Sequence, residues 1–158
     1  MHSKLKSGDL LHRSKGIVQH AGVYLGNEMV LHNQPEKGVV ITSYSEYAEG
    51  KDVKITSISD TDKKLLVSRL HETFDSDCRY QLLANNCEHV ANYLISGRKM
   101  SPQIQAAIVG MALGGIAQNY FKNGHLLLWL AGGAIAGLMT LNIAKNYDYT
   151  ITPIVQSV

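Results

Sequence analysis

The chain has 158 residues, enough for one domain, and its 15 basic and 13 acidic residues leave a net charge of +2. This near balance, without a basic stripe, argues against a nucleic-acid partner. Two cysteines are too few for a disulfide framework, and the first residues lack the apolar core of a signal peptide, so we expect a reducing, cytoplasmic setting.

The first half of the chain predicts a sheet followed by helices. Runs of alternating or β-branched residues predict strands at 8–13, 18–25, 28–33, 38–43 and 52–58. An amphipathic pattern predicts a helix over 59–76, and a short strand at 79–83 precedes a second helix that starts at Cys87. The expected fold class is therefore α+β, an antiparallel sheet packed with helices.

Two histidines lie in the strands that flank a turn at Gly26 and Asn27. A two-residue turn would place His20 and His32 on opposite faces of the sheet, because side chains alternate along a strand. A three-residue loop over 25–27 would pair Tyr24 with Glu28, and His20 would then lie opposite His32 on one face. Only this odd-length loop gives a shared site.

The stretch "ANNCEHVANYLISG" predicts a helix with Cys87 in its first turn. Asn85 or Asn86 is the expected N-cap, and Gly97 is the expected stop. The positive end of the helix dipole favours the thiolate, so Cys87 is a candidate nucleophile; the alternative is a small buried apolar residue. His89 follows two positions later on a different helix face, so the base must come from elsewhere in the domain.

Four motifs carry a family resemblance: "GDLL", "QHAGVYLG", "VLHN" and "NNCEHV". Over about residues 8 to 118 the chain resembles the lecithin retinol acyltransferase family and its phospholipase/acyltransferase relatives. The resemblance implies a circularly permuted papain-like domain. It also implies that His20 is the general base, that His32 orients it and that Cys87 is the nucleophile.

These three residues would transfer an acyl group through a thioester on Cys87. The expected donor is a phospholipid, and the acceptor an amine, an alcohol or water. No cofactor is expected. A metal site is not expected either, because the sequence lacks paired-cysteine spacing and a histidine pair at i and i+4.

The C-terminal third is strongly apolar, with Lys122, Lys145 and Asp148 its only charged residues after Lys99. The apolar runs at 104–117 and 126–144 predict two helices that form a hairpin, and the second is long enough to span a bilayer. Basic residues at both outer ends favour a cytoplasmic location for those ends. The alternative is that the two helices cover the domain or an oligomer.

The expected organisation is a catalytic domain over 1–99, an apolar helical hairpin over 100–145 that anchors it in a membrane, and a polar tail over 146–158. The expected function is a membrane-associated thiol acyltransferase or phospholipase, with the catalytic domain on the cytoplasmic side. Two alternatives stay open. One is a papain-like cysteine peptidase or amidase, and the other is a non-catalytic membrane-binding module.

Overall fold

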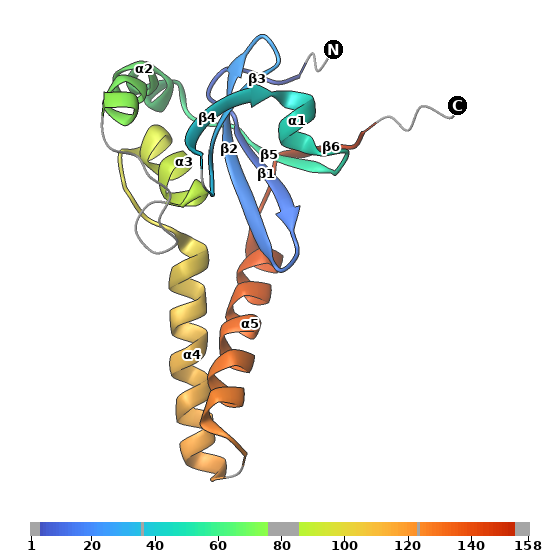
Figure 1. The fold of residues 1–158 in the computed structure, drawn as a ribbon, viewed down its shortest axis with the longest axis vertical. Coiled ribbons are helices and arrows are strands. Elements are labelled where there is room, and N and C mark those ends of the chain that lie inside the picture. The colour runs from blue at the N-terminus through green and yellow to red at the C-terminus, as the bar shows by residue number, and fades with distance from the viewer. Residues whose placement is uncertain (1–3, 36, 76–85, 123, 154–158) are drawn as a thin grey trace. The chain divides into compact units, whose positions relative to one another are not determined.

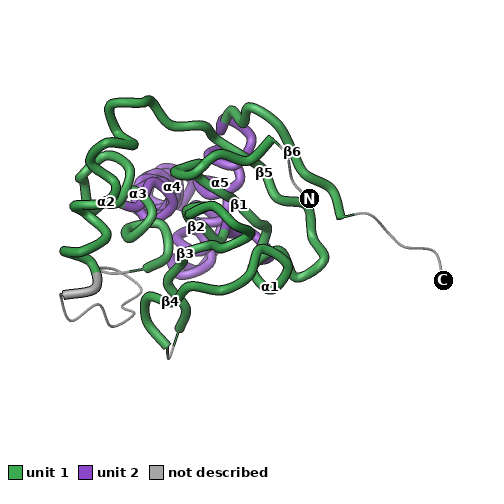
Figure 2. The backbone as a smooth tube through the Cα atoms, turned by 90° about the horizontal axis from the view of Figure 1, so that it is seen from above, with its two compact units in different colours: residues 1–14, 20–100, 146–158 green, residues 15–19, 101–145 purple. Residues whose placement is uncertain are grey.

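The computed structural model describes residues 4–35, 37–75, 86–122 and 124–153. The chain divides into two compact units (Figure 2). Unit 1 comprises residues 1–14, 20–100 and 146–158, and unit 2 comprises residues 15–19 and 101–145. The predicted strand at 79–83 lies outside the described residues.

A sheet of six strands forms the core of unit 1 (Figure 1). Its strands are β1 (Leu10–Lys15), β2 (Val18–Gly26), β3 (Met29–Gln34), β4 (Gly38–Ser43), β5 (Val53–Thr56) and β6 (Tyr149–Ile151). The spatial order is β4-β3-β2-β1-β5-β6, and the pairs β2–β3, β3–β4, β1–β5 and β5–β6 are antiparallel. The α+β class predicted from the sequence is confirmed.

Side-chain alternation gives the sheet two apolar faces. One face packs with helix α1 (Tyr44–Ala48). The buried side chains that the sheet and α1 contribute to this layer are Leu11, Tyr24, Val30, Tyr44, Tyr47, Ala48, Val53 and Ile55. The other packs with helices α2 (Asp60–Asp75) and α3 (Cys87–Ser96), and its buried side chains are Ala21, Val23, Leu31, Leu66, Val90, Ala91 and Leu94. Each face therefore holds its own helices by burying apolar surface.

Helix α3 has the boundaries that the sequence predicts. The side-chain oxygen of Asn86 accepts hydrogen bonds from the backbone N–H groups of Glu88 and His89, and Gly97 ends the helix with a φ of 71°. Arg69 of α2 donates hydrogen bonds to the backbone oxygens of Leu94 and Ile95. These bonds satisfy carbonyl groups that have no partner within the last turn of a helix.

Unit 2 is built on two antiparallel helices, α4 (Pro102–Phe121) and α5 (Leu126–Ala144). Their backbones approach so closely at glycines that a Cβ atom at Gly110 would overlap the carbonyl oxygen of Gly133, and one at Gly114 that of Trp129. A Cβ at Gly137 would overlap the carbonyl oxygen of Ala106. Such contacts between small residues are typical of helix pairs that form in lipid.

Two short elements were not predicted. Helix α1 has only five residues, and strand β6 has three. Residues 146–158 were expected to be a polar tail, but Tyr149–Ile151 pairs with β5 and extends the sheet. Elements this short contain too few residues to display a periodic pattern.

Candidate active site

The predicted register between β2 and β3 is wrong. Tyr24 pairs with Val30, not with Glu28, and His32 lies opposite Gly22, not opposite His20. The turn itself has two residues, Asn27 and Glu28, and both have a positive φ.

A shift in the ladder compensates for this even-length turn. Gly26 pairs with Met29, and the register changes by one residue between Tyr24 and Gly26. A β-bulge of this kind reverses the face on which all later residues of one strand point, relative to the other. His20 and His32 therefore share a face as expected, although a different local structure puts them there.

The two imidazole rings are in contact within unit 1. His20 Nε2 lies 2.8 Å from His32 Nδ1, and the ring centroids are 5.0 Å apart with the planes nearly perpendicular. Both side chains are buried. Because His20 lies diagonally from His32 across the two strands, the rings must reach toward each other over the position of Gly22.

Gly22 leaves the space that this arrangement needs. A Cβ atom at this position would lie 2.8 Å from Cε2 of Tyr47 and 2.9 Å from Cγ1 of Val30, closer than van der Waals contact. Tyr47 therefore packs directly over the backbone of β2. A side chain at position 22 would displace the ring that contacts both histidines.

Tyr47 is a site residue that sequence reasoning missed. Its ring stacks on His20 with centroids 5.6 Å apart, and it meets His32 edge-on at 5.3 Å. Its hydroxyl is shared between the backbone oxygens of Leu11 and His20, at 2.9 and 2.8 Å. The ring thus holds the His20 side chain, and the hydroxyl holds the His20 backbone.

A local signal for helix α1 was present in the sequence "SYSE". Ser43 is the N-cap, its hydroxyl accepts from the backbone N–H of Glu46, and the Glu46 carboxylate accepts from the backbone N–H of Ser43. This reciprocal pair is a capping box. It predicts a helix start at Tyr44, and one turn of helix places Tyr47 toward the sheet.

His32 is electrically neutral near neutral pH. Burial and the nearby Arg13 guanidinium lower the pKa of His32 to about 4, against the smaller opposing effects of Glu49 and Glu46. Its second ring nitrogen, Nε2, lies 3.1 Å from Thr42 Oγ1 and 3.4 Å from Gln34 Nε2. At neutral pH His32 therefore carries one ring proton, and its partners decide which nitrogen holds it.

A buried cation lies next to this cluster. Arg13 is almost fully buried, its guanidinium lies 5.7 Å from the centroid of the Tyr47 ring, and it forms an ion pair with Glu49. The positive charge disfavours a second positive charge on His32. Arg13 thereby helps to keep His32 neutral.

Cys87 is the first residue of α3 and is half-buried. Burial, and to a lesser extent the electrostatic effect of an ionised Cys87, raises the pKa of Tyr47 well above its ordinary value. Cys87 therefore lies within electrostatic range of the tyrosine on which His20 stacks. The structure brings His20 and His32 into direct contact. Cys87 is linked to this pair through its electrostatic effect on Tyr47.

Among the residues that the structure describes, no group of three or more His, Cys, Asp or Glu side chains is arranged to hold a metal ion.

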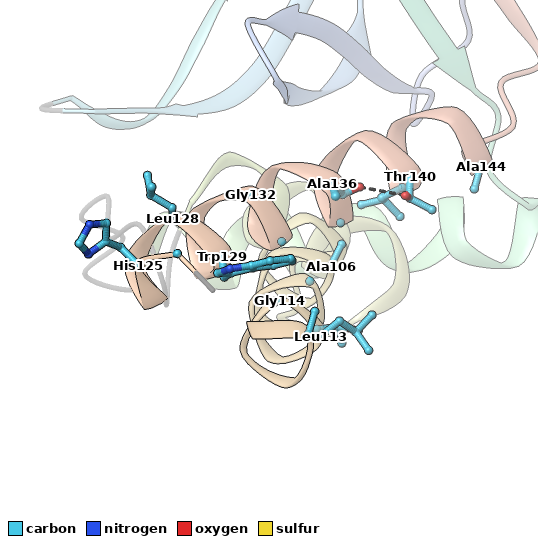
Figure 3. A pocket seen from close by; sticks show the side chains of 17 residues that line it. Ala106, Leu113, Gly114, His125, Leu128, Trp129, Gly132, Ala136, Thr140 and Ala144 are labelled. Carbon is cyan, nitrogen blue, oxygen red and sulfur yellow. Dashed lines mark hydrogen bonds between the residues drawn. The ribbon is translucent and has the colours of Figure 1, made fainter. Parts of the chain in front are cut away.

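An apolar groove lies elsewhere, along α4 and α5 within unit 2. Its volume is about 860 Å³, and its walls include Ala106, Leu113 and Trp129 (Figure 3). The one hydroxyl in its lining, that of Thr140, donates to the backbone oxygen of Ala136 at 2.8 Å. The groove thus offers an incoming molecule almost no polar partner.

Comparison with known proteins places the chain in a family. The family model for lecithin retinol acyltransferase matches residues 3–100, which include His20, His32 and Cys87. The chain belongs to the lecithin retinol acyltransferase family. The recognition made from the sequence motifs is confirmed.

Individual relatives are distant in sequence. Lecithin retinol acyltransferase of Rattus norvegicus is 30% identical over 132 residues, covering 62% of this chain and 57% of that protein. The Mus musculus protein of the same name is 28% identical over 137 residues, which cover 65% of this chain and 59% of that protein. The chain therefore spans less than two thirds of these lecithin retinol acyltransferases. Phospholipase A and acyltransferase 3 of Homo sapiens is 23% identical over 134 residues, which cover 70% of this chain and 83% of that protein.

Proposed function

We propose that this member of the lecithin retinol acyltransferase family is a membrane-associated acyltransferase or phospholipase that acts on glycerophospholipids through a thioester on Cys87. The names of the relatives support the reaction class. The observation that carries the proposal is the His20–His32 contact beside Tyr47, with Cys87 in electrostatic range of that tyrosine.

His20 is the general base in this mechanism. It takes the proton of the Cys87 thiol, the thiolate attacks the ester carbonyl carbon, and the C–O bond of the donor breaks as the tetrahedral intermediate collapses. His20 then returns its proton to the departing alkoxide oxygen. The products of this half-reaction are the lysophospholipid and the acyl thioester.

His32 orients His20 and fixes its tautomer. A base that accepts the thiol proton at Nδ1 must carry its own proton at Nε2, and this proton is donated to His32 Nδ1. A neutral His32 then holds its single proton at Nε2 and donates it to Thr42 Oγ1. Gln34 fits this chain of donors when its amide oxygen, not its nitrogen, faces His32.

The start of α3 supplies the electrostatic part of the mechanism. The Asn86 side chain caps this helix end, and the N–H of Cys87 lies beside the reacting sulfur at the positive end of the helix. We assign this N–H to binding the oxyanion of the tetrahedral intermediate. The same helix end lowers the cost of forming the thiolate.

The second half-reaction releases the acyl group. An amine, an alcohol or water attacks the thioester carbonyl while His20 accepts its proton; the C–S bond breaks, and the departing Cys87 thiolate takes this proton back from His20. An amine gives an amide, an alcohol gives an ester, and water gives a fatty acid. The same residues therefore support transferase and phospholipase reactions.

Membrane association brings the site to its substrate. Among the described residues one helix, Leu126–Ala144, is long and apolar enough to cross a bilayer. Large apolar side chains on both helices of unit 2 are exposed, including Leu113 and Leu127. Arg98, Lys99 and Lys145 flank the pair of helices, which favours a cytoplasmic location for the catalytic domain.

Labelled phosphatidylcholine vesicles test this function. Purified full-length protein is incubated with the vesicles, with and without an added amine, and fatty acid and N-acyl product are measured. We expect one or both products from the native chain and neither from the Cys87→Ala variant. A folded, vesicle-bound protein that forms neither product would contradict the proposal, as would full activity of Cys87→Ala.

A further inference from the structure

The chain returns to the sheet of unit 1 immediately after α5. Strand β6 pairs with β5, with Ile151 opposite Val53 and Tyr149 opposite Ile55. The Asp148 carboxylate accepts from the backbone N–H of Ser57 at 2.6 Å, and the Asp148 N–H donates to the Ile55 oxygen at 2.8 Å. Residues on both sides of the α4–α5 segment thus belong to one sheet.

This pairing restricts how the chain can cross a bilayer. Hydrogen-bonded neighbours in a sheet lie about 5 Å apart, whereas the hydrocarbon core of a bilayer is about 30 Å thick. If α5 crossed alone, β6 would emerge on the side opposite to β5, and the pair could not form. The number of crossings between residues 100 and 146 is therefore even.

We infer that α4 and α5 cross the bilayer together as a helical hairpin, and that α5 does not cross alone. This inference rests on the membrane association proposed above and specifies how many helices cross the bilayer. The partner of the outer surface of both helices is lipid. The connection between them, which begins at Lys122 and ends at His125, then reaches the far face of the membrane.

Surface chemistry favours two crossings over none. Neither Pro102–Phe121 nor Leu126–Ala144 contains a charged residue. Large apolar side chains point away from the helix contact, with Leu113 62%, Leu127 77% and Ile143 86% exposed. A soluble surface rarely carries so extended an apolar patch, whereas lipid covers it without cost.

The helix lengths match a bilayer. Helix α4 has 20 residues and α5 has 19, which at 1.5 Å per residue gives about 30 Å for each. Helix α4 is less apolar than α5, because Gln103 and Gln105 lie in its first turn and Gln118 and Asn119 in its last turns. These residues lie at the two ends of the helix, where they would reach the polar head groups rather than the hydrocarbon.

An aromatic cluster marks the same end of the hairpin. The rings of Tyr120 and Phe121 lie 5.2 Å apart, and those of Phe121 and Trp129 stack at 5.9 Å. Aromatic residues are enriched at the boundary between hydrocarbon and head groups. The position of this cluster next to Lys122 and His125 is the one expected for a turn at the far interface.

Single-cysteine labelling tests the topology. In a background of Cys78→Ser and Cys87→Ser, three exposed positions receive one cysteine each: Lys51→Cys before the hairpin, His125→Cys in the turn and Thr152→Cys after β6. The full chain is added to preformed, sealed phosphatidylcholine vesicles. A membrane-impermeant maleimide is supplied either outside the vesicles or trapped inside them.

We expect the outside reagent to label Lys51→Cys and Thr152→Cys, and the trapped reagent to label His125→Cys. Labelling of all three positions from outside would overturn the inference, because the helices would then lie on the surface. Labelling of Thr152→Cys from inside would show a single crossing, and a His125→Cys that reacts with neither reagent would show incomplete insertion. Both results would also overturn it.

The labelling result is separate from the proposed reaction, which is measured on the same vesicles with the native cysteines. A chain that forms acyl products while its turn is labelled from outside keeps the proposed function and loses the hairpin. A chain that shows the predicted labelling but forms no acyl product keeps the hairpin and loses the proposed function. Co-flotation with the vesicles confirms that each variant is bound.

Discussion

His20 Nε2 and His32 Nδ1 are 2.8 Å apart, although the two residues are diagonal neighbours in the sheet and not a directly opposed pair. Gly22, which does oppose His32, has no side chain to separate the rings, and Tyr47 closes over the gap. The contact therefore depends on the absence of a side chain at Gly22 and on the packing of the Tyr47 ring. Changes that leave both histidines in place can still disturb it.

The hydroxyl of Thr42 should matter for the reactivity of Cys87. In the proposed mechanism it accepts the His32 Nε2 proton and so fixes the tautomer that accepts from His20. Thr42→Val removes this acceptor with little change of shape, and a lost hydrogen bond of about 0.5–1.5 kcal/mol corresponds to a roughly 2- to 10-fold slower alkylation of Cys87 by iodoacetamide near neutral pH. Thr42→Ser keeps the hydroxyl and is the matched control. Equal rates for the two variants would remove Thr42 from the mechanism.

Stability should fall at mildly acidic pH because of His32. Its pKa is about 4 in the folded protein and about 6.5 in the unfolded chain. Between these values the unfolded state binds a proton that the folded state does not, so the free energy of unfolding decreases as the pH falls from 6.5 to 4. Urea unfolding at pH 7 and pH 5 measures this. His32→Gln should lose less stability than the native chain over that interval, and an equal loss in both would refute the assignment.

Gln103 should stabilise the end of β2 that precedes His20. Within unit 2 its side-chain oxygen accepts from the Gln19 N–H at 2.7 Å, and its amide nitrogen donates to the Gln19 oxygen at 2.9 Å. Gln103→Ala would leave two buried backbone groups without these partners, at a cost of about 1–3 kcal/mol for each. The control is Gln105→Ala, an exposed glutamine in the same helix. We expect lower urea stability and slower Cys87 alkylation only for Gln103→Ala. Identical behaviour of the two variants would count against this role.

Neighbouring glycines in α5 should respond differently to the same substitution. A Cβ at Gly133 would overlap the Gly110 carbonyl oxygen, whereas one at Gly132 would meet nothing within 4 Å. Gly133→Ala should therefore destabilise the helix pair by about 1–3 kcal/mol. Gly132→Ala should be neutral or stabilising by up to about 1 kcal/mol, because alanine is the better helix former. Thermal unfolding in detergent, followed by circular dichroism, measures both. A Gly133→Ala variant as stable as Gly132→Ala would show that the helices do not pack through these glycines.

Local signals explain which parts of the fold were predictable. The boundaries of α3 follow from Asn86 and Gly97, because a cap depends on residues within one turn. The burial of Val90, Ala91 and Leu94 follows from their helical spacing, which places all three on one face of α3.

The register of the histidine strands depends on contacts from elsewhere in the chain. Glu28 adopts a positive φ that is rare for its residue type, and its backbone is held by the Tyr24 hydroxyl and by the N–H of Tyr44. Rules that predict a turn from its own residues do not take account of the Tyr24 hydroxyl or the Tyr44 N–H. The bulge that restores the shared face was for the same reason not predictable from the turn alone.

Nonlocal packing also explains the missed residues. Tyr47 belongs to the site only because β2 lacks a side chain at Gly22, a relationship between distant parts of the sequence. Strand β6 exists because β5 offers an unpaired edge after the chain has passed through two long helices. Its three residues predict little by themselves.

Trapping the acyl-enzyme is the most direct test of the central claim. Native protein is exposed to phosphatidylcholine vesicles, quenched in acid, digested and analysed by mass spectrometry for an acyl group on the peptide that contains Cys87. We expect a hydroxylamine-sensitive acyl adduct on Cys87 in the native chain and in His89→Ala, and a strongly reduced adduct in His20→Ala, with folding of each variant checked by circular dichroism. Release of acyl product by a chain that never carries the adduct, or adduct formation that His20→Ala leaves unchanged, would contradict the account.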